Sequence, residues 1–155
     1  MLAAMVGICL LVAMIALPAG GALSRARAAL GAGDAGEALA ALDEALRADP
    51  EGVEALRLLG QATLSLGRYD DAATAFRRAA ELAGPSSPDG LAALCGLADA
   101  QARSEQNVEA LATLDRVLAA APSRPAVHHD MGKIHFALGR LEAAAGQALP
   151  QPGEE

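Results

Sequence analysis

The chain has 155 residues, of which 53% are hydrophobic but only 2% aromatic, and its formal net charge is -7. Alanine and leucine fill most apolar positions, which favours helices, because both residues have a high helix propensity. The acidic balance argues against a nucleic-acid partner, since a phosphate backbone requires a clustered basic surface.

The first 22 residues, MLAAMVGICLLVAMIALPAGGA, form the most apolar segment of the chain and carry no charged side chain. As a helix, residues 2–17 would rise about 24 Å and residues 2–23 about 33 Å, against a hydrocarbon core of about 30 Å. We favour a membrane anchor through residues 2–22. The alternatives are a cleaved secretory signal, with a cleavage site near Ala22, and an apolar helix buried in a soluble fold.

Two opposing arguments bear on the side of the membrane where the remaining chain lies. Arg25 and Arg27 come after the segment and nothing basic precedes it, so the positive-inside bias would keep the remainder in the cytoplasm. N-terminal single spans and signals, however, usually export the domain on their C-terminal side. We therefore expect a single-pass protein of a bacterial inner membrane whose main domain is periplasmic.

Residues 31–36, GAGDAG, match the glycine pattern G-x-G-x-x-G of dinucleotide-binding loops. Such a loop comes directly after a β-strand, whereas the flanking stretches SRARAAL and EALAALDEALR have helical patterns. We therefore expect a turn between two helices, in which Gly33 has a positive φ and Asp34 caps the second helix, with Glu37 three residues later. No cofactor is expected at this turn.

An internal repeat organises the rest of the chain. Residues 67–85, GRYDDAATAFRRAAELAGP, lie over residues 33–50, GDAGEALAALDEALRADP, at an offset of 34 residues. Residues 53–67 are similar to residues 126–140, and both stretches hold two glycines at the same spacing. These similarities predict several copies of one structural unit.

Each predicted helix has one apolar stripe, which it can bury only by packing on neighbouring helices. Small residues such as Gly60 let two backbones approach, and Gly96 is predicted to take the same role in the next unit. Pro50, Pro85 and Pro122 end the second helices, because proline cannot continue the hydrogen-bond ladder. The stripes contain Leu39, Leu42 and Leu46, then Leu56, Leu59 and Thr63, then Leu111, Leu114 and Leu118.

This pattern resembles the tetratricopeptide repeat, a helix-turn-helix unit of 34 residues with small residues where its two helices cross. The unit at residues 53–86 matches best, and its matching residues are Leu59, Gly60, Gly67, Tyr69, Ala72, Phe76 and Ala79. The third unit departs from the pattern through its turn RSEQN, which is predicted to be about two residues longer. The first unit has Arg25-Ala26 where Leu-Gly is expected, and the fourth stops at Pro150 before its second helix is complete.

The resemblance implies an all-α fold, an α-solenoid of about three and a half such units preceded by an apolar N-terminal helix. It also divides the chain into three regions. Residues 1–22 are the membrane anchor or signal segment, residues 23–149 the repeat domain, and residues 150–155 a short acidic tail.

In this family the first helix of each unit faces a concave groove, which the resemblance implies is the binding surface. The groove residues carried over are Arg27, Glu54, Arg57, Gln61, Ser65, Gln101, His129, Lys133 and Phe136. Several of these are basic, so an acidic peptide or a C-terminal carboxylate would suit the groove. Family members that clamp the carboxylate of chaperones use asparagines with lysine and arginine, and these asparagines are missing here. The alternative is an ordinary solvated face without a specific ligand.

The remaining candidate residues have simpler interpretations. His128 and His135 share one helix face, but no third ligand joins them, so we expect packing and no metal site. Cys9 and Cys95 lie in different surroundings and predict no disulfide, and Cys95 is expected to be buried and inert. Catalytic patterns such as G-x-S-x-G and H-E-x-x-H are absent from the sequence, so neither an enzyme nor a small-molecule substrate is expected.

We therefore expect a non-enzymatic scaffold that binds a protein or peptide in its groove at a bacterial membrane, where it would serve the assembly of an envelope complex. The alternative is a structural accessory subunit that packs into a membrane protein complex through its N-terminal helix. The incomplete fourth unit favours this alternative, since an unfinished end leaves apolar surface for another protein.

Overall fold

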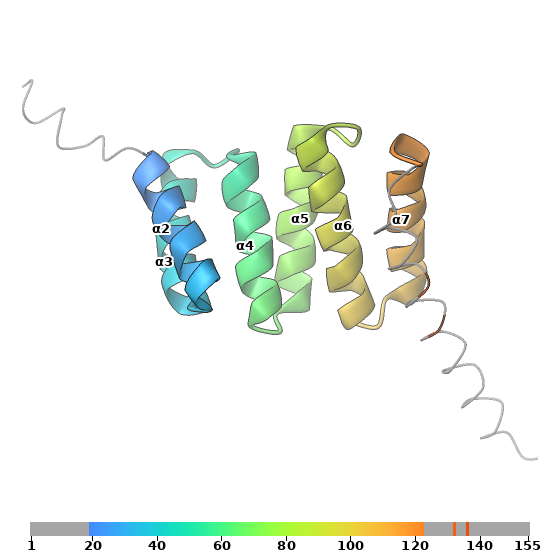
Figure 1. Cartoon of the computed structure of the whole chain (residues 1–155), viewed down its shortest axis with the longest axis horizontal. Helices are drawn as coiled ribbons and strands as arrows, with labels where there is room; N and C mark the ends of the chain where they lie inside the picture. Colours follow the sequence, from blue (N-terminus) through green and yellow to red (C-terminus); the bar gives the residue numbers. More distant parts are fainter. Residues whose placement is uncertain (1–18, 123–131, 133–135, 137–155) are drawn as a thin grey trace, which may run out of the picture.

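The computed structural model describes residues 19–122 and the single residues 132 and 136. Six helices and their turns make up the continuous part, and that part contains no strand, which confirms the all-α class. In Figure 1 the helices stand side by side in chain order, with α2 in front of α3 and α6 in front of α5. The helices are α2 (Ala19–Ala32), α3 (Ala35–Ala48), α4 (Val53–Ser65), α5 (Tyr69–Ala83), α6 (Pro88–Arg103) and α7 (Asn107–Ala120).

The six helices pair into three helix-turn-helix units, α2 with α3, α4 with α5 and α6 with α7, and each pair packs against the next. This arrangement is the predicted solenoid of stacked pairs. The predicted fourth unit and the acidic tail, residues 126–155, lie outside the described residues except for positions 132 and 136.

The first described helix extends past the predicted boundary of the repeat domain. Helix α2 starts at Ala19, so the predicted boundary after residue 22 falls inside this helix. Ala22, Ala26 and Ala29 are buried in a core that α2 shares with α3 and α4. Residues 1–18, which hold most of the predicted membrane segment, are not described. None of the six described helices is long and apolar enough to cross a membrane.

The GAGDAG stretch contains the turn between α2 and α3, as predicted, and the turn itself is Gly33 and Asp34. Gly33 has a φ of 80°, in the left-handed region that favours glycine. Asp34 caps α3 by accepting a hydrogen bond from the backbone N–H of Glu37 at 2.9 Å. Helices on both sides of the stretch rule out the strand that a dinucleotide loop requires.

The turn of the third unit is not longer than that of the second, and the prediction of two extra residues was wrong. Residues 104–106 link α6 to α7, and residues 66–68 link α4 to α5 in the same way. Glu105 has a φ of 65° where Gly67 has a φ of 72°. The additional length lies in α6, which has 16 residues against 13 in α4. A glutamate therefore holds a conformation that usually requires glycine.

The hydrogen bonds of these two turns place α4 and α6 in a common register. The N–H of Gln106 donates to the carbonyl of Gln101 at 2.8 Å, and the N–H of Arg68 donates to the carbonyl of Thr63 at 2.9 Å. Gln101 thus corresponds to Thr63. The sequence prediction paired Gly96 with Gly60, which places α6 two residues away from this register.

Phe76 is the largest fully buried side chain among the described residues. A Cβ atom at Gly60 would lie 2.7 Å from its ring, and a Cβ atom at Gly96 would lie 2.6 Å from it. In the register of the turns, Ala98 and not Gly96 corresponds to Gly60. Gly96 therefore does not repeat the role of Gly60, because it contacts the aromatic ring of the preceding unit.

Replacing Glu105 with glycine should raise the free energy of unfolding by about 0.5–1 kcal/mol. The substitution removes the left-handed strain of a residue with a Cβ atom, and this gain exceeds the greater flexibility of glycine in the unfolded chain. Urea denaturation of the two proteins measures the difference. Gly67→Ala is the matched control and should destabilise the protein, whereas an equal loss from Glu105→Gly would contradict the assignment of this turn.

Candidate functional site

A groove runs between α4 and α6 on the side of the solenoid that the first helices of the units form. Its first part is a hollow of about 450 Å³ lined by Arg57, Gln61, Leu64, Phe76, Ala92, Cys95, Gly96, Asp99 and Arg103. Its second part, of about 510 Å³, is lined by Leu64, Ser65, Leu66, Gly67, Tyr69 and Arg103. Leu64 and Arg103 belong to both linings, so the two parts form one continuous depression, which we call the α4–α6 groove.

Arg57 projects into the α4–α6 groove from the middle of α4 and is half-buried. Its Nε atom is buried and has no hydrogen-bond partner among the described residues. A buried donor without a partner costs about 1–3 kcal/mol. The guanidinium also forms no ion pair with a described residue, so its charge is left for a ligand. A carboxylate suits a guanidinium best, because it can accept two parallel N–H bonds.

The other arginines near the α4–α6 groove are paired. Arg27 Nε of α2 donates to Glu54 Oε1 of α4 at 3.0 Å, and Arg103 Nε donates to Asp99 Oδ1 within α6 at 3.1 Å. The hydrogen bond from Arg103 to Asp99 and the charge of Asp99 raise the pKa of Arg103. Arg57 is therefore the groove arginine that lacks an ion pair within the described part of the chain.

Two further predicted groove residues line this depression. Gln61 is exposed in the first part, and Ser65 is exposed in the second part, where its Oγ donates to the carbonyl of Gln61 at 2.9 Å. Both side chains come after Arg57 along α4 at helical spacing, so they share its face. The groove therefore presents the amide of Gln61 and the hydroxyl of Ser65 beside the unpaired guanidinium of Arg57.

Gln101 was predicted to face the groove and does not. Its side chain is 6% exposed, and its Oε1 accepts a hydrogen bond from Thr113 Oγ1 of α7 at 2.8 Å. The register of the turns explains the error, because Gln101 corresponds to the buried Thr63 and not to the exposed Ser65. Gln101 therefore joins α6 to α7 within one unit.

Only Phe136 of the groove residues predicted for the last helix is described. Phe136 is 68% exposed and lines neither part of the α4–α6 groove. His129 and Lys133, with His128 and His135, lie outside the described residues, so their roles stay predictions. Within the described ranges, no group of three or more histidine, cysteine, aspartate or glutamate side chains could hold a metal ion.

Three polar residues of the groove were not predicted from the sequence, and the burial of Cys95 was predicted wrongly. Tyr69, Asp99 and Arg103 line it, and the spacing of Asp99 and Arg103 by one helical turn was a signal that could have placed them on one face. Cys95 was expected to be buried, but it is only half-buried and lines the groove. The errors within α6 result from its shifted register.

Comparisons with known proteins agree with this architecture. The family model described as tetratricopeptide repeat matches residues 23–88, 64–125 and 95–150. The NMR structure of the first TPR domain of human RPAP3 is similar at 21% identity and a TM-score of 0.72, and the match covers 81% of this chain and 95% of that chain. No curated protein matches the sequence.

Two further solved structures have the same fold over most of this chain. The first TPR of Spaghetti (RPAP3), bound to the HSP90 peptide SRMEEVD, is 21% identical, with a TM-score of 0.70 and coverage of 78% of this chain and 95% of that chain. A mutant O-GlcNAc transferase of Thermobaculum terrenum is 28% identical, with a TM-score of 0.66. That match covers 75% of this chain but only 22% of the transferase.

Proposed function

Since this chain belongs to the tetratricopeptide repeat family, we propose that it is a non-enzymatic scaffold that binds a segment of another protein in its α4–α6 groove. Repeats of this family are in general interaction modules without catalytic activity. A domain of similar fold has been solved with a bound peptide, which supports a peptide as the ligand. The proposed contact residues are Arg27, Arg57, Gln61 and Ser65, together with His129 and Lys133 of the predicted fourth unit.

The unpaired guanidinium of Arg57 carries this proposal. Arg103, the other described arginine that lines this groove, is paired with Asp99, and the chain has a formal net charge of -7. A carboxylate of the ligand would pair with Arg57, while Gln61 and Ser65 would bond to its backbone. We therefore propose an acidic peptide or a C-terminal carboxylate as the ligand.

The HSP90 peptide SRMEEVD that the Spaghetti domain binds is one peptide of this chemistry. The only asparagine of the present chain is Asn107, which begins α7 and is buried away from the groove lining. The asparagines that other family members use to hold a chaperone carboxylate are thus missing. We expect the ligand of this chain to be acidic but to differ from the chaperone tail.

Replacing Arg57 with methionine should weaken the binding of acidic peptides at least about tenfold, because a hydrogen bond to a charged group contributes about 1.5–3 kcal/mol. The same variant should be as stable as the original chain or more stable by about 1 kcal/mol, since the unsatisfied buried Nε is gone. Fluorescence anisotropy with acidic heptapeptides that end in a free carboxylate measures binding. Thermal unfolding measures stability.

Arg116→Met is the matched control, because Arg116 is an exposed arginine of α7 that does not line the groove. It should leave peptide binding within about twofold. Amidated forms of the same peptides separate recognition of the terminal carboxylate from recognition of acidic side chains. Equal binding by Arg57→Met and by the original chain would contradict the proposal.

We further propose that the scaffold is attached to a bacterial inner membrane through residues 2–22, with its repeats in the periplasm and a role in envelope assembly. The apolar character of this segment supports the proposal. The full chain should sediment with membranes and resist extraction by alkaline carbonate, and deletion of residues 2–18 should release it. Protease added to spheroplasts should degrade it, whereas recovery of the full chain in the soluble fraction would contradict the attachment.

The second candidate function is that of an accessory subunit of a membrane protein complex, held through the N-terminal segment. An accessory subunit and a groove scaffold should respond differently to Arg57→Met and to the deletion of residues 2–18. An accessory subunit should still co-purify with its complex when Arg57 is replaced with methionine, but not when residues 2–18 are deleted. A groove scaffold should lose its partner in the first case. The intact mass of the purified protein also distinguishes a mature chain that begins at Met1 from one cleaved near Ala22.

A further inference from the structure

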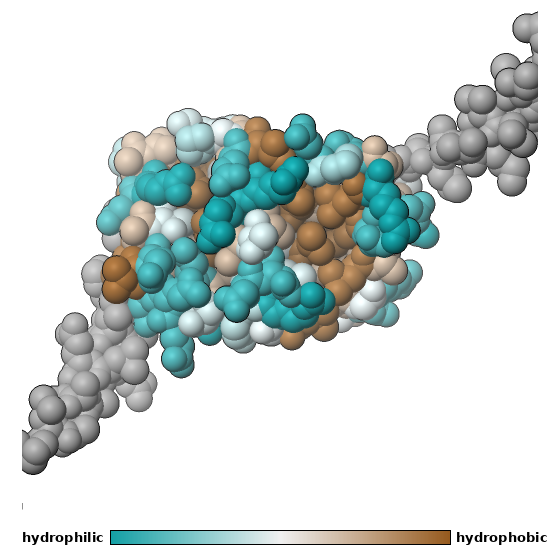
Figure 2. Space-filling model, turned by 180° about the vertical axis from the view of Figure 1, so that it is seen from behind, coloured by the Kyte–Doolittle hydropathy of each residue, from teal (hydrophilic) through white to brown (hydrophobic). Residues whose placement is uncertain are grey.

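A second hollow lies on the opposite side of the solenoid, between the second helices of the first two units. Figure 2 views the molecule from behind relative to Figure 1, and hydrophobic side chains gather there in a depression between hydrophilic ones. The hollow has a volume of about 330 Å³, and we call it the α3–α5 hollow. Its lining residues are Leu39, Leu56, Leu59, Thr63, Arg68, Asp71, Thr74, Ala75 and Arg78.

The hollow exists because the first two units pack against each other through α4. Leu58 of α4 belongs to the core that holds α2 and α3, whereas Leu56 belongs to the core that holds α5, α6 and α7. The space between α3 and α5 lies over the boundary of these two cores. Leu39 of α3 and Leu59 of α4 are only half-buried there, so their apolar side chains still contact solvent.

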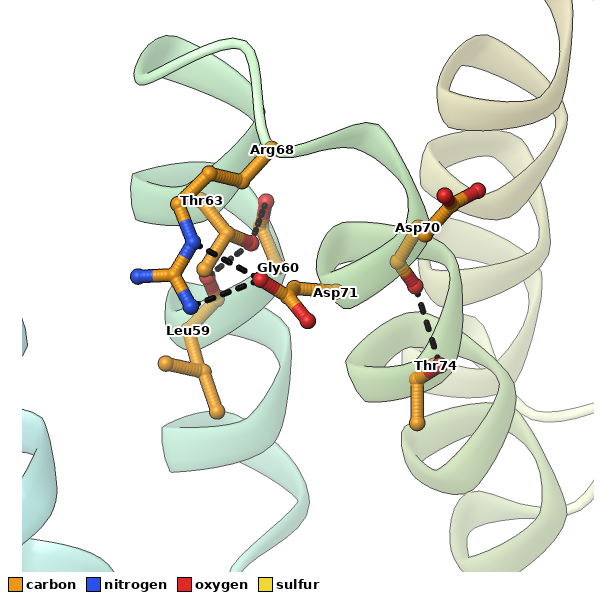
Figure 3. Close-up of polar contacts among 7 residues, drawn as sticks. All are labelled: Leu59, Gly60, Thr63, Arg68, Asp70, Asp71 and Thr74. Atoms are coloured by element: carbon orange, nitrogen blue, oxygen red, sulfur yellow. Dashed lines mark hydrogen bonds and ion pairs between the residues drawn. The ribbon is translucent and has the colours of Figure 1, made fainter. Parts of the chain in front are cut away.

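Most polar side chains that line the α3–α5 hollow already have hydrogen-bond partners, as Figure 3 shows. Thr63 Oγ1 donates to the carbonyls of Leu59 and Gly60, at 2.8 and 3.1 Å. Arg68 Nε donates to Asp71 Oδ2 at 2.7 Å. The hydroxyl of Thr74 donates to a carbonyl of its own helix at 2.9 Å. The interior is thus left to apolar contacts.

Arg78 is the exception at this rim. It is exposed, lines the hollow, and forms no ion pair with any described residue. Arg77 and Arg116, which line the neighbouring hollow between α5 and α7, are likewise without an ion pair among the described residues. The chain as a whole has a formal net charge of -7, but these three arginines make the surface of α5 and α7 opposite the α4–α6 groove locally basic.

The neighbouring hollow between α5 and α7 is an internal comparison. It has nearly the same volume, about 310 Å³, but its lining includes Glu81, Gln101 and Thr113, and the last two are hydrogen-bonded to each other. In the register of the turns, Leu94 and Leu97 of this hollow correspond to Leu56 and Leu59, but Gln101 and Thr113 stand where the smaller Thr63 and Ala75 lie in the α3–α5 hollow. The α3–α5 hollow is therefore the more apolar of the two.

We propose that the α3–α5 hollow is a second docking surface, which takes an acidic amphipathic helix of a partner protein. Apolar side chains one turn apart on that helix would enter the hollow against Leu39 and Leu59, and a carboxylate beside them would pair with Arg78. One apolar face of the helix would lie over the hollow, and its polar face would remain in solvent. This surface lies opposite the α4–α6 groove and does not depend on a ligand there.

Selection of displayed random peptides tests this inference, with peptides long enough for about four helical turns. The full-length Arg57→Met variant is the selecting protein, so that peptides that bind outside the α4–α6 groove are favoured. The enriched sequences should carry leucine-like residues at i, i+3 or i+4 and i+7, with aspartate or glutamate beside them. Arg78→Glu, which reverses the charge, and Thr74→Trp, which fills the hollow, should each weaken the binding of these peptides at least about tenfold.

Arg77→Glu is the matched control, because it makes the same charge change one residue away on α5 but faces the other hollow. It should weaken binding by less than about threefold. Thermal unfolding of each variant checks the fold. The inference is overturned if no peptide of this pattern is enriched, if the enriched peptides bind Arg78→Glu and Thr74→Trp as well as the original chain, or if Arg77→Glu weakens them equally.

Discussion

Replacing Phe76 with alanine should lower the free energy of unfolding by about 3–5 kcal/mol, the largest loss that we expect from truncating any one side chain. The ring is 2% exposed and belongs to the core that joins α4 to α5, α6 and α7. It also forms part of the floor of the α4–α6 groove, so the cavity would open beneath the proposed binding surface. Urea denaturation followed by circular dichroism measures the loss, and peptide binding should fall with it.

Gly60 and Gly96 both face this ring, and a larger residue at either position should destabilise the protein. A Cβ atom at Gly60 would lie 2.7 Å from the ring of Phe76, so Gly60→Ala should cost about 1–3 kcal/mol despite the higher helix propensity of alanine. Gly31→Ala is the matched control in α2, because a Cβ atom there would meet nothing within 4 Å. That control should stabilise the protein by up to about 1 kcal/mol.

The first unit indicates how this clash can be relieved. In the register of the turns, Gly60 and Phe76 of the second unit correspond to Ala26 and Leu42 of the first, and all four residues are buried. The double variant Gly60→Ala with Phe76→Leu should therefore be more stable than the sum of the two single losses predicts, by about 0.5–3 kcal/mol. A coupling energy below about 0.5 kcal/mol would contradict the assigned contact.

Gly90→Ala should destabilise the protein by about 3 kcal/mol or more, because the added Cβ atom would overlap the carbonyl oxygen of Gly84 and lie 2.8 Å from its carbonyl carbon. The backbone at Gly84 cannot move away easily. Its φ is 83°, and its carbonyl accepts hydrogen bonds from the N–H of Ser87 at 3.2 Å and from Ser87 Oγ at 3.0 Å. Ser87 in turn caps α6 by accepting from the N–H of Gly90 at 2.9 Å.

The expected consequence of Gly90→Ala is the loss of the close packing between α5 and α6, with α6 and α7 unfolding at lower denaturant than the first two units. Native-state hydrogen exchange resolves this order. Gly36→Ala is the matched control in the first turn of α3, where the nearest atom to an added Cβ is Asp34 Oδ1 at 3.4 Å. It should be neutral or slightly stabilising. A similarly small effect of Gly90→Ala would contradict the described connection between α5 and α6.

Local features of the chain could be predicted from the sequence because they depend on residues close to one another. The helical periodicity of leucine and alanine predicted paired helices, and Asp34 with Gly33 predicted the turn between α2 and α3. The left-handed Glu105 was not predictable, since propensity assigns this conformation to glycine. Nor did the sequence mark Gly90, whose importance lies in contacts with Gly84 across a turn.

The groove was only partly predictable, because its residues come from more than one helix. Arg57, Gln61 and Ser65 lie one turn apart on a single helix, so their shared face could be read from spacing alone. The assignment of Gln101 failed because it required the register of α6 relative to α4, which the longer α6 changes. His129 and Lys133 lie outside the described residues, so their place in the groove stays a prediction.

The sequence by itself determined the helices, their pairing into repeats and the turn between α2 and α3, since these depend on patterns that span at most one repeat. Tertiary structure decided which charges remain unpaired and which apolar surfaces remain open. Arg57 is unpaired because Glu54 pairs with Arg27 and Asp99 with Arg103, and the α3–α5 hollow remains because two cores meet at α4. Both depend on how helices far apart in the chain are rotated against one another, which no local pattern encodes.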